Sequence, residues 1–141
     1  MKKILFIIVV VMVSLLAGCT SIGSGYLEKK CTKVEEGAVK RETTYVISFK
    51  NNIISKTVLK ETYMFEDNEL KNNMLKGFKD LEASNKHDGV SIKTSDIDNS
   101  CSIEYTFELK TIDKEVKEKY HLNSKYNKQE SILVDLGYTC N

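Results

Sequence analysis

The most regular pattern in this sequence is the stretch Cys101-Ser102-Ile103-Glu104-Tyr105-Thr106-Phe107-Glu108-Leu109. Its apolar residues occupy every second position, which is the period that sends alternate side chains to opposite faces of a β-strand. We therefore expect a strand whose odd-numbered side chains face a core and whose even-numbered side chains face solvent.

Upstream of this strand, residues 26–65 also have the composition of antiparallel strands. Residues 41–50 are rich in β-branched and aromatic side chains, and three of them alternate onto one face: Tyr45, Ile47 and Phe49. Asn51-Asn52 interrupts the pattern, which resumes over 53–65. Because Asn tolerates the positive φ of a tight turn, a β-hairpin is predicted. Residues 26–34 predict a further strand of poorer alternation, followed by a turn.

The period changes after Asp67, where a helix is expected. Asp67 or Asn68 can cap it, and residues 85–89 end it. Apolar residues recur at spacings of four, four and three, which places them on one helical face: Leu70, Met74, Phe78 and Leu81. We expect this stripe to cover the sheet as core; an apolar ligand groove is the alternative. A strand then begins at residue 90.

Two shorter helices are expected after residue 109. Asp113 can cap the first, which ends near Leu122, and Asn127 begins the second, with Glu130 three residues on in a capping box. The second stops at Gly137, and we expect it to pack on the core through the side chains of Ile132, Leu133 and Leu136. The order β-β-β-α-β-β-α-α predicts an α+β domain, an antiparallel sheet with its helices packed mainly on one face.

The N-terminus has the pattern of a bacterial lipoprotein signal. Two lysines precede an apolar run over 4–16, and the run leads into the lipobox Leu16-Ala17-Gly18-Cys19. About thirteen apolar residues are too few for a transmembrane helix, which needs about twenty. We expect cleavage before Cys19, lipidation of its thiol and attachment to a cell membrane on the extracytoplasmic face. An ordinary secretory signal with an incidental cysteine is the alternative.

Three segments follow from this pattern: a signal peptide over 1–18, a lipidated N-terminus and flexible tether over 19–25, and a single α+β domain over 26–141. Cleavage leaves 141 − 18 = 123 residues. It removes two of the 21 basic residues and none of the 20 acidic ones, so the mature chain is nearly neutral. Nothing in this balance indicates a nucleic-acid partner. Whether the membrane is an inner or an outer one stays open.

The lipobox, the hairpin, the helix after Asp67, the strand pair over 89–109 and the closing Leu136-Gly137-Tyr138 together resemble the YehR-like family of small bacterial lipoproteins. The resemblance lies in the overall layout and covers nearly the whole mature chain. It implies a small α+β lipoprotein domain whose biochemical role is itself unassigned, and it transfers no site residues.

Lipidation of Cys19 leaves three cysteines, Cys31, Cys101 and Cys140, in an exported chain where disulfides can form. One bridge and one free thiol is the simplest outcome, and three pairings are open. We favour Cys31 with Cys140, because Cys101 lies on the predicted core face as a small buried hydrophobe. Three reduced thiols are the alternative.

The sequence predicts no catalytic residue, cofactor site or metal site. His87 and His121 lie in different elements without a second ligand at metal spacing, and both are expected to be exposed. The acidic run over 96–99 lacks the glycine and closing glutamate of a calcium loop, which favours a turn. No nucleotide-binding or hydrolase motif is present.

We therefore expect a non-enzymatic binding or interaction module, anchored at the cell envelope and directed at an envelope protein partner. The alternative is a small-ligand- or metal-handling protein. Its pocket would lie between the sheet and the helix, near Tyr63, Met74, Phe78 and Phe107.

Overall fold

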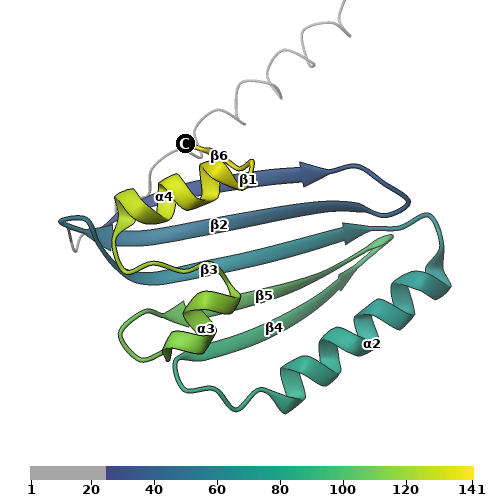
Figure 1. Ribbon diagram of the computed structural model, residues 1–141. Helices are drawn as coiled ribbons and strands as arrows, with labels where there is room; N and C mark the ends of the chain where they lie inside the picture. Colours follow the sequence, from purple (N-terminus) through teal and green to yellow (C-terminus); the bar gives the residue numbers. More distant parts are fainter. Residues whose placement is uncertain (1–24) are drawn as a thin grey trace, which may run out of the picture.

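The computed structural model describes residues 25–141, so the predicted signal peptide and Cys19 lie outside the described residues. Within them, a six-stranded antiparallel sheet has the strand order β4-β5-β3-β2-β1-β6 (Figure 1). The elements are β1 Leu27–Glu35, β2 Lys40–Lys50, β3 Ile53–Met64, α2 Asn68–Ser84, β4 Val90–Ile97, β5 Ser100–Glu108, α3 Lys114–Lys119, α4 Tyr126–Asp135 and β6 Thr139–Cys140. No helix of residues 25–141 combines the length and the apolar content that a membrane span requires. The predicted α+β class is confirmed, and β6 is an addition to the predicted order.

The predicted hairpin is formed by β2 and β3. Lys50 pairs with Ile53, and the two residues between them, Asn51 and Asn52, have φ values of 50° and 65°. Two consecutive positive φ values belong to the tight turn whose twist matches that of the flanking strands. The asparagine pair therefore sets the turn, as the sequence indicated.

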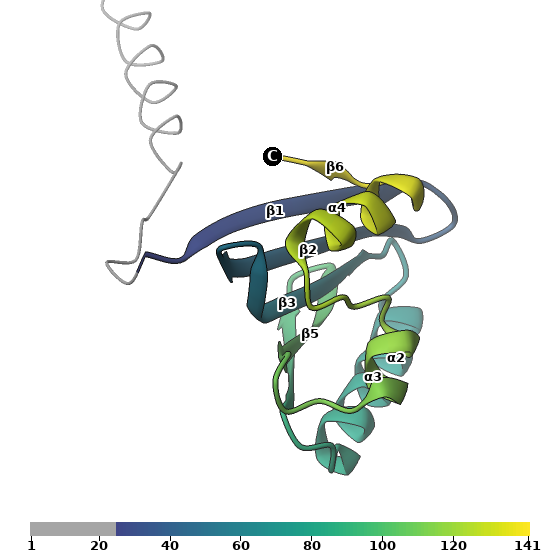
Figure 2. The same cartoon turned by 60° about the vertical axis from the view of Figure 1, so that its left-hand side comes forward.

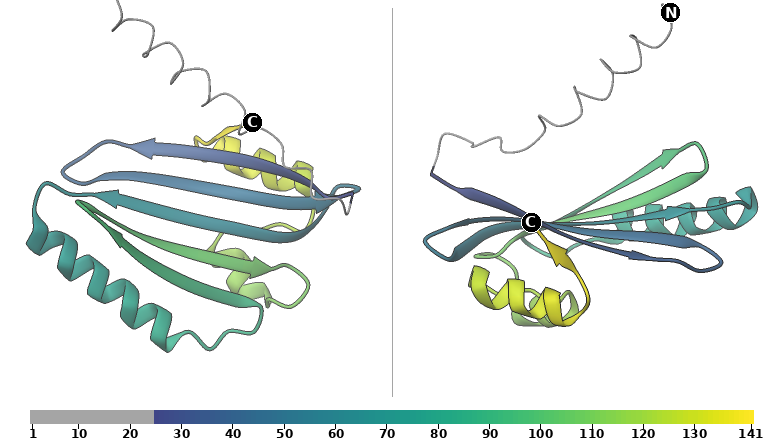
Figure 3. Two further views of the ribbon diagram at one scale, coloured as in Figure 1. Left: turned by 180° about the vertical axis from the view of Figure 1, so that it is seen from behind. Right: turned by 90° about the horizontal axis from the view of Figure 1, so that it is seen from above.

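The sheet has one helix-covered face and one helix-free face (Figures 2 and 3). Strand β5 shows the predicted alternation, because its odd-numbered residues from 101 to 107 are at most 8% exposed. The main core forms where the odd-numbered residues of β2 and β5 meet α3 and α4, and it includes Tyr45, Ile47, Phe49, Ile103, Phe107, Val116 and Leu133. Burial of each large apolar side chain contributes about 1.5–3 kcal/mol.

Helix α2 buries a face that overlaps the predicted one only in part. Asp67 caps it as expected, but Leu70 and Leu81 are 53% and 49% exposed, and the most buried positions are Lys71 and Leu75. The helix packs along the margin of the sheet, against β4 and β5, so only a narrow strip of it is covered (Figure 1). Met74 and Phe78, the middle of the predicted stripe, pack against that margin.

Helix α4 begins at Tyr126 without the predicted capping box. The side chain of Asn127 bonds to Asn52, and the backbone N–H groups of Tyr126 and Asn127 donate to Asn52 at 2.9 Å each. Asn52 of the β2–β3 turn therefore accepts hydrogen bonds from backbone N–H groups at the start of the helix, where the sequence predicted a capping box with Glu130. Leu133 is buried and Ile132 is half-buried, as the sequence suggested, but Leu136 is 40% exposed and the second fully buried residue is Gln129.

Candidate interaction site on the helix-covered face

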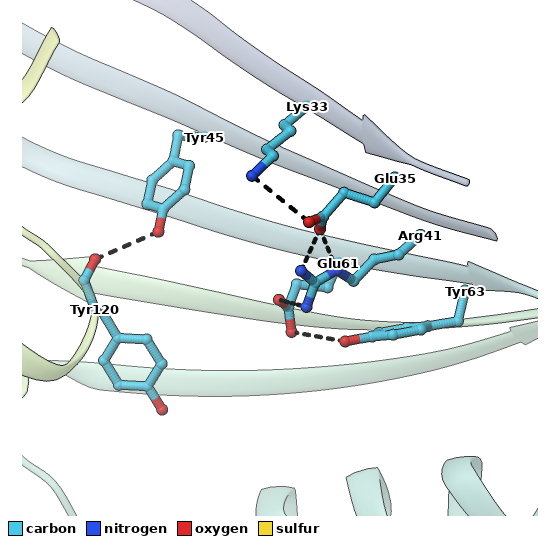
Figure 4. A network of polar contacts seen from close by, with 7 residues as sticks. All are labelled: Lys33, Glu35, Arg41, Tyr45, Glu61, Tyr63 and Tyr120. Carbon is cyan, nitrogen blue, oxygen red and sulfur yellow. Dashed lines mark hydrogen bonds and ion pairs between the residues drawn. The ribbon is translucent and has the colours of Figure 1, made fainter. Parts of the chain in front are cut away.

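A group of charged and aromatic side chains lies on the helix-covered face, toward the end of the sheet opposite the β2–β3 turn. Cross-strand pairing aligns Glu35 with Arg41 and Tyr63, and it aligns Lys33 with Thr43 and Glu61. We call the charged and phenolic members of these two rows the Arg41 cluster: Lys33, Glu35, Arg41, Glu61 and Tyr63 (Figure 4). Three neighbouring strands thus place five functional side chains on one face.

The Arg41 cluster is a chain of alternating charges. Arg41 donates through Nε to Glu35 Oε2 at 2.8 Å, and its Nη2 donates to the same oxygen. Lys33 Nζ lies 3.5 Å from Glu35 Oε1, and Arg41 Nη1 lies 3.8 Å from Glu61 Oε1. Tyr63 donates its hydroxyl to Glu61 Oε2 at 3.4 Å (Figure 4). Each charge therefore has an opposite neighbour, and the cluster is held in place without a net charge.

The contact between Arg41 and Glu35 favours the ionised form of both side chains. The hydrogen bond from Arg41 lowers the pKa of Glu35, and the bond to Glu35 raises the pKa of Arg41. Burial, followed by the charge of Glu61, raises the pKa of Tyr63, so its phenol keeps the proton that it donates. Glu35 and Arg41 therefore form an ion pair at neutral pH, and Tyr63 is a neutral phenol.

Further tyrosines surround the cluster. The rings of Tyr45 and Tyr138 meet edge to face with centroids 5.3 Å apart, and Lys33 Nζ lies 5.8 Å from the Tyr138 centroid. Tyr45 donates its hydroxyl to the backbone carbonyl of Tyr120 at 3.3 Å, which closes the site toward α3 (Figure 4). Burial raises the pKa of Tyr45 and Tyr138, and the charge of Glu61 adds to both shifts. The site is therefore aromatic around a charged centre.

The side chains of the cluster are partly exposed to solvent, although hydrogen bonds and ion pairs hold them in place. The exposed fraction of the side chain is 24% for Glu61, 32% for Lys33, 39% for Glu35 and 40% for Arg41. Such half-buried side chains lose little further freedom when another molecule covers them. The arrangement can contact a partner through charge-assisted hydrogen bonds and aromatic surface.

Sequence reasoning missed the Arg41 cluster, although a signal was present. Alternation marks the odd-numbered positions of β2 as core-facing. Arg41 is the next odd-numbered position before Thr43 and Tyr45, so it lies on the same face. A charged residue at an inward position is a stronger indication of a site than a charged residue at an outward one.

The residues of the predicted pocket divide between two parts of the core. Met74 and Phe78 of α2 pack with Tyr63 of β3, and the Tyr63 and Phe78 ring centroids are 5.6 Å apart. Phe107 is fully buried in the main core. A cavity of about 160 Å³ lies further along α2, between it, β4 and α3, and its lining includes Leu81, Asn85, Ile92, Tyr105, Val116 and Tyr120. Sites for drug-sized ligands have volumes of about 300 Å³ or more, so this cavity has room only for a smaller molecule.

Among residues 25–141, two cysteines form a disulfide and one is free. A disulfide joins Cys31 to Cys140, which are directly opposed residues of β1 and β6. Cys101 is free and 1% exposed, and burial raises the pKa of its thiol. Cys19 lies outside the described residues. The bridge therefore fastens the two-residue closing strand to the sheet.

The structure places both histidines on the surface, in agreement with the sequence. Among residues 25–141 no three His, Cys, Asp or Glu side chains are grouped so that they could hold a metal ion. The acidic run over 96–99 joins β4 to β5: Asp96 and Ile97 end β4, and the predicted turn is formed by Asp98, with φ 47°, and Asn99. Lys71 Nζ binds there, 2.8 Å from the Asp96 carboxylate and 2.6 Å from the Asp98 carbonyl oxygen.

Comparison with known proteins gives a likeness in fold. The chain is similar to a solved NMR structure of a protein from Streptococcus pneumoniae TIGR4, with a TM-score of 0.60 and 14% sequence identity. The match covers 84% of this chain and 87% of that one. No family model and no curated protein matches the sequence. The chain thus belongs to the structural class of small α+β domains that this sheet and its three helices define.

Proposed function

We propose that this protein is a lipid-anchored lipoprotein of the cell envelope, related to the YehR-like lipoproteins, and that its folded domain is a non-enzymatic binding module. In this proposal Cys19 carries the lipid on the extracytoplasmic face of the membrane, and the Arg41 cluster contacts an envelope protein partner. The lipobox supports the anchor, and the layout of the sequence supports the family.

The observation that carries the binding role is the chemistry of the Arg41 cluster. Arg and Tyr are among the residues most enriched in the energetic centres of protein interfaces, where rigid side chains meet a partner in a partly dry setting. Here an arginine and a tyrosine are already held by carboxylates and remain partly exposed. Paired charges of both signs favour selection of one complementary partner over general electrostatic attraction.

The edge strand β4 offers a poorer contact, because α2 blocks it. Thr94 donates both its backbone N–H, at 3.2 Å, and its hydroxyl, at 2.6 Å, to the Glu82 carboxylate. The side-chain amide of Asn85 donates to the Val90 carbonyl at 2.8 Å. Groups satisfied in this way are not free to add a strand from another chain. This favours recognition through side chains of the sheet face.

Photocrosslinking in intact cells tests the proposed site. A photoreactive phenylalanine analogue is placed at Tyr63 and, as a control, at Val46, which is also half-buried but faces the helix-free side. We expect a discrete crosslinked protein from position 63, little or none from position 46, and loss of the product when Arg41→Ala is added. Equal products from both positions, or a product that is insensitive to Arg41→Ala, would contradict the proposal.

A second candidate function, small-ligand handling, is favoured by the 160 Å³ cavity beside α3. Its lining combines apolar side chains with Asn85, His87 and Glu115, and its volume suits a small ring. Titration with phenol and indole tests it by NMR. Saturable shifts of the Ile92 and Val116 methyl signals would support this candidate, and unchanged signals would exclude these ring ligands.

A further inference from the structure

The end of the sheet at which β1 begins combines exposed apolar side chains with lysines. Leu27 is 62% exposed, Ile53 59% and Tyr26 39%. Four exposed lysines belong to the same end: Lys29, Lys50, Lys125 and Lys128. We call this surface the hairpin end. Soluble domains normally keep such exposed apolar side chains scattered, so their grouping marks a contact surface.

Three segments that are distant in sequence build the hairpin end. Leu27 pairs with Phe49 across β1 and β2, and Ile53 forms an isolated bridge with Lys125 ahead of α4. Lys50 Nζ lies 5.9 Å from the centroid of the Tyr26 ring. The β2–β3 turn, the start of β1 and the start of α4 are accordingly found at one end of the molecule (Figure 1).

The charges of the hairpin end suit an anionic surface. The four lysines outnumber two neighbouring carboxylates: Glu28, which accepts a bond from the Ser48 hydroxyl, and Glu130, which accepts one from the Tyr126 hydroxyl. Lysines beside tyrosine and aliphatic side chains are the combination that binds the boundary between lipid headgroups and acyl chains. The lysine charges attract anionic headgroups, and the apolar side chains enter between them.

The sequence places this end next to the proposed anchor. Six residues separate Cys19 from Tyr26, and a chain of that length reaches at most about 20 Å. We infer that the hairpin end docks on an anionic lipid surface, with Leu27 and Ile53 entering the headgroup region; this rests on the proposed lipid at Cys19.

Docking in this manner orients the Arg41 cluster. Arg41 lies nine residues before Lys50 on β2, which corresponds to about 30 Å along an extended strand. The cluster is therefore carried away from the lipid and toward other proteins, while a tether without docking leaves the domain free to turn.

Single-tryptophan fluorescence tests the docking, because the chain has no tryptophan of its own. Ile53→Trp places the probe at the hairpin end, and Ile97→Trp is the matched control at the opposite end of the sheet, with 62% exposure against 59%. The full lipidated protein is reconstituted in vesicles of phosphatidylglycerol and phosphatidylcholine with brominated acyl chains, and flotation checks attachment. Both positions are exposed, so either variant keeps the core.

The docking predicts a blue shift and quenching by brominated lipid for Ile53→Trp, and neither for Ile97→Trp. Adding Lys50→Gln, Lys125→Gln and Lys128→Gln to Ile53→Trp should lower the quenching in the mixed vesicles. The lowered value should equal that of Ile53→Trp alone in vesicles of phosphatidylcholine without phosphatidylglycerol. Floating vesicles with unquenched Ile53→Trp would overturn the docking and leave the anchor standing. Equal quenching of both probes would also overturn it. Protein that fails to float would overturn the anchor and, with it, the docking.

Discussion

At the scale of single residues, Gln129 shows how α4 is held to the chain before it. The side chain is fully buried, its Oε1 accepts from the Asn123 N–H at 2.6 Å, and its Nε2 donates to the His121 carbonyl at 2.9 Å. Gln129→Leu leaves both backbone groups without that partner, so we expect a loss of about 2–3 kcal/mol in the free energy of unfolding. Urea denaturation measures it, with Ser131→Ala, an exposed change in the same helix, as a neutral control.

The bond between Arg41 and Glu35 predicts a pH-dependent contribution to stability. Because the folded protein lowers the pKa of Glu35, the bond stabilises the fold above the ordinary carboxyl pKa and loses this effect as pH falls through the lowered value. Arg41→Gln should therefore unfold more easily than the native protein at pH 7, with the difference shrinking at about pH 3. A difference that stays constant over this range would contradict the assignment.

The cysteines predict a definite alkylation count. With Cys31 bonded to Cys140 and Cys19 lipidated, the unfolded, unreduced protein should take one alkyl group, at Cys101, and three after reduction. Mass spectrometry reads both numbers. Closing a loop of 109 residues stabilises the fold by up to about 4–5 kcal/mol in the chain-entropy description. Three alkyl groups without reduction would mean that the bridge is absent.

At the scale of elements, one glycine is required by its backbone conformation and another is not. Gly89, before β4, has φ +74°, and an added Cβ would lie 2.7 Å from the Thr111 Cβ. Gly77, within α2, has nothing within 4 Å of an added Cβ. We expect Gly89→Ala to lower the melting temperature and Gly77→Ala to raise stability by about 0.5–1 kcal/mol. Thermal unfolding of the pair checks both signs.

Elements whose pattern is local were predictable from the sequence, and those set by distant contacts were not. The alternation of Cys101 to Leu109 and the Asn51-Asn52 turn act through neighbouring residues, so the strand and the hairpin followed directly. Helix α4 begins within one residue of the expected start, but its first turn is satisfied by Asn52, 75 residues away, in place of the expected capping box. Strand β6 has two residues, too few to show a period, and it pairs with β1, 109 residues earlier in the chain, where Cys140 is bonded to Cys31.

The Arg41 cluster and the hairpin end could be predicted only in part. The odd-numbered charged positions of β1, β2 and β3 could have suggested polar groups on the core side. Which of them meet depends on the register of three strands, and that register is fixed by the fold. Similarly, no lysine run exists in the sequence; Lys50 and Lys125 become neighbours through the contacts of Ile53.

At the scale of the whole molecule, the sheet gives the domain two chemically different ends. The hairpin end carries exposed apolar side chains and lysines beside the proposed anchor, and the opposite end carries the Arg41 cluster. The fold itself is shared with the Streptococcus pneumoniae protein at 14% identity, so the layout tolerates wide change in sequence. The assignment of a role to each end rests on these side chains, since a shared fold does not define a function.

The intact mass of the protein isolated from the membrane fraction of cells tests whether Cys19 holds this domain to a membrane. We expect a chain that lacks residues 1–18 and carries a diacylglyceryl group on Cys19, and we expect Cys19→Ala to abolish this species. A membrane-bound chain that retains Met1, or a mature chain that begins at Cys19 without lipid, would contradict this expectation.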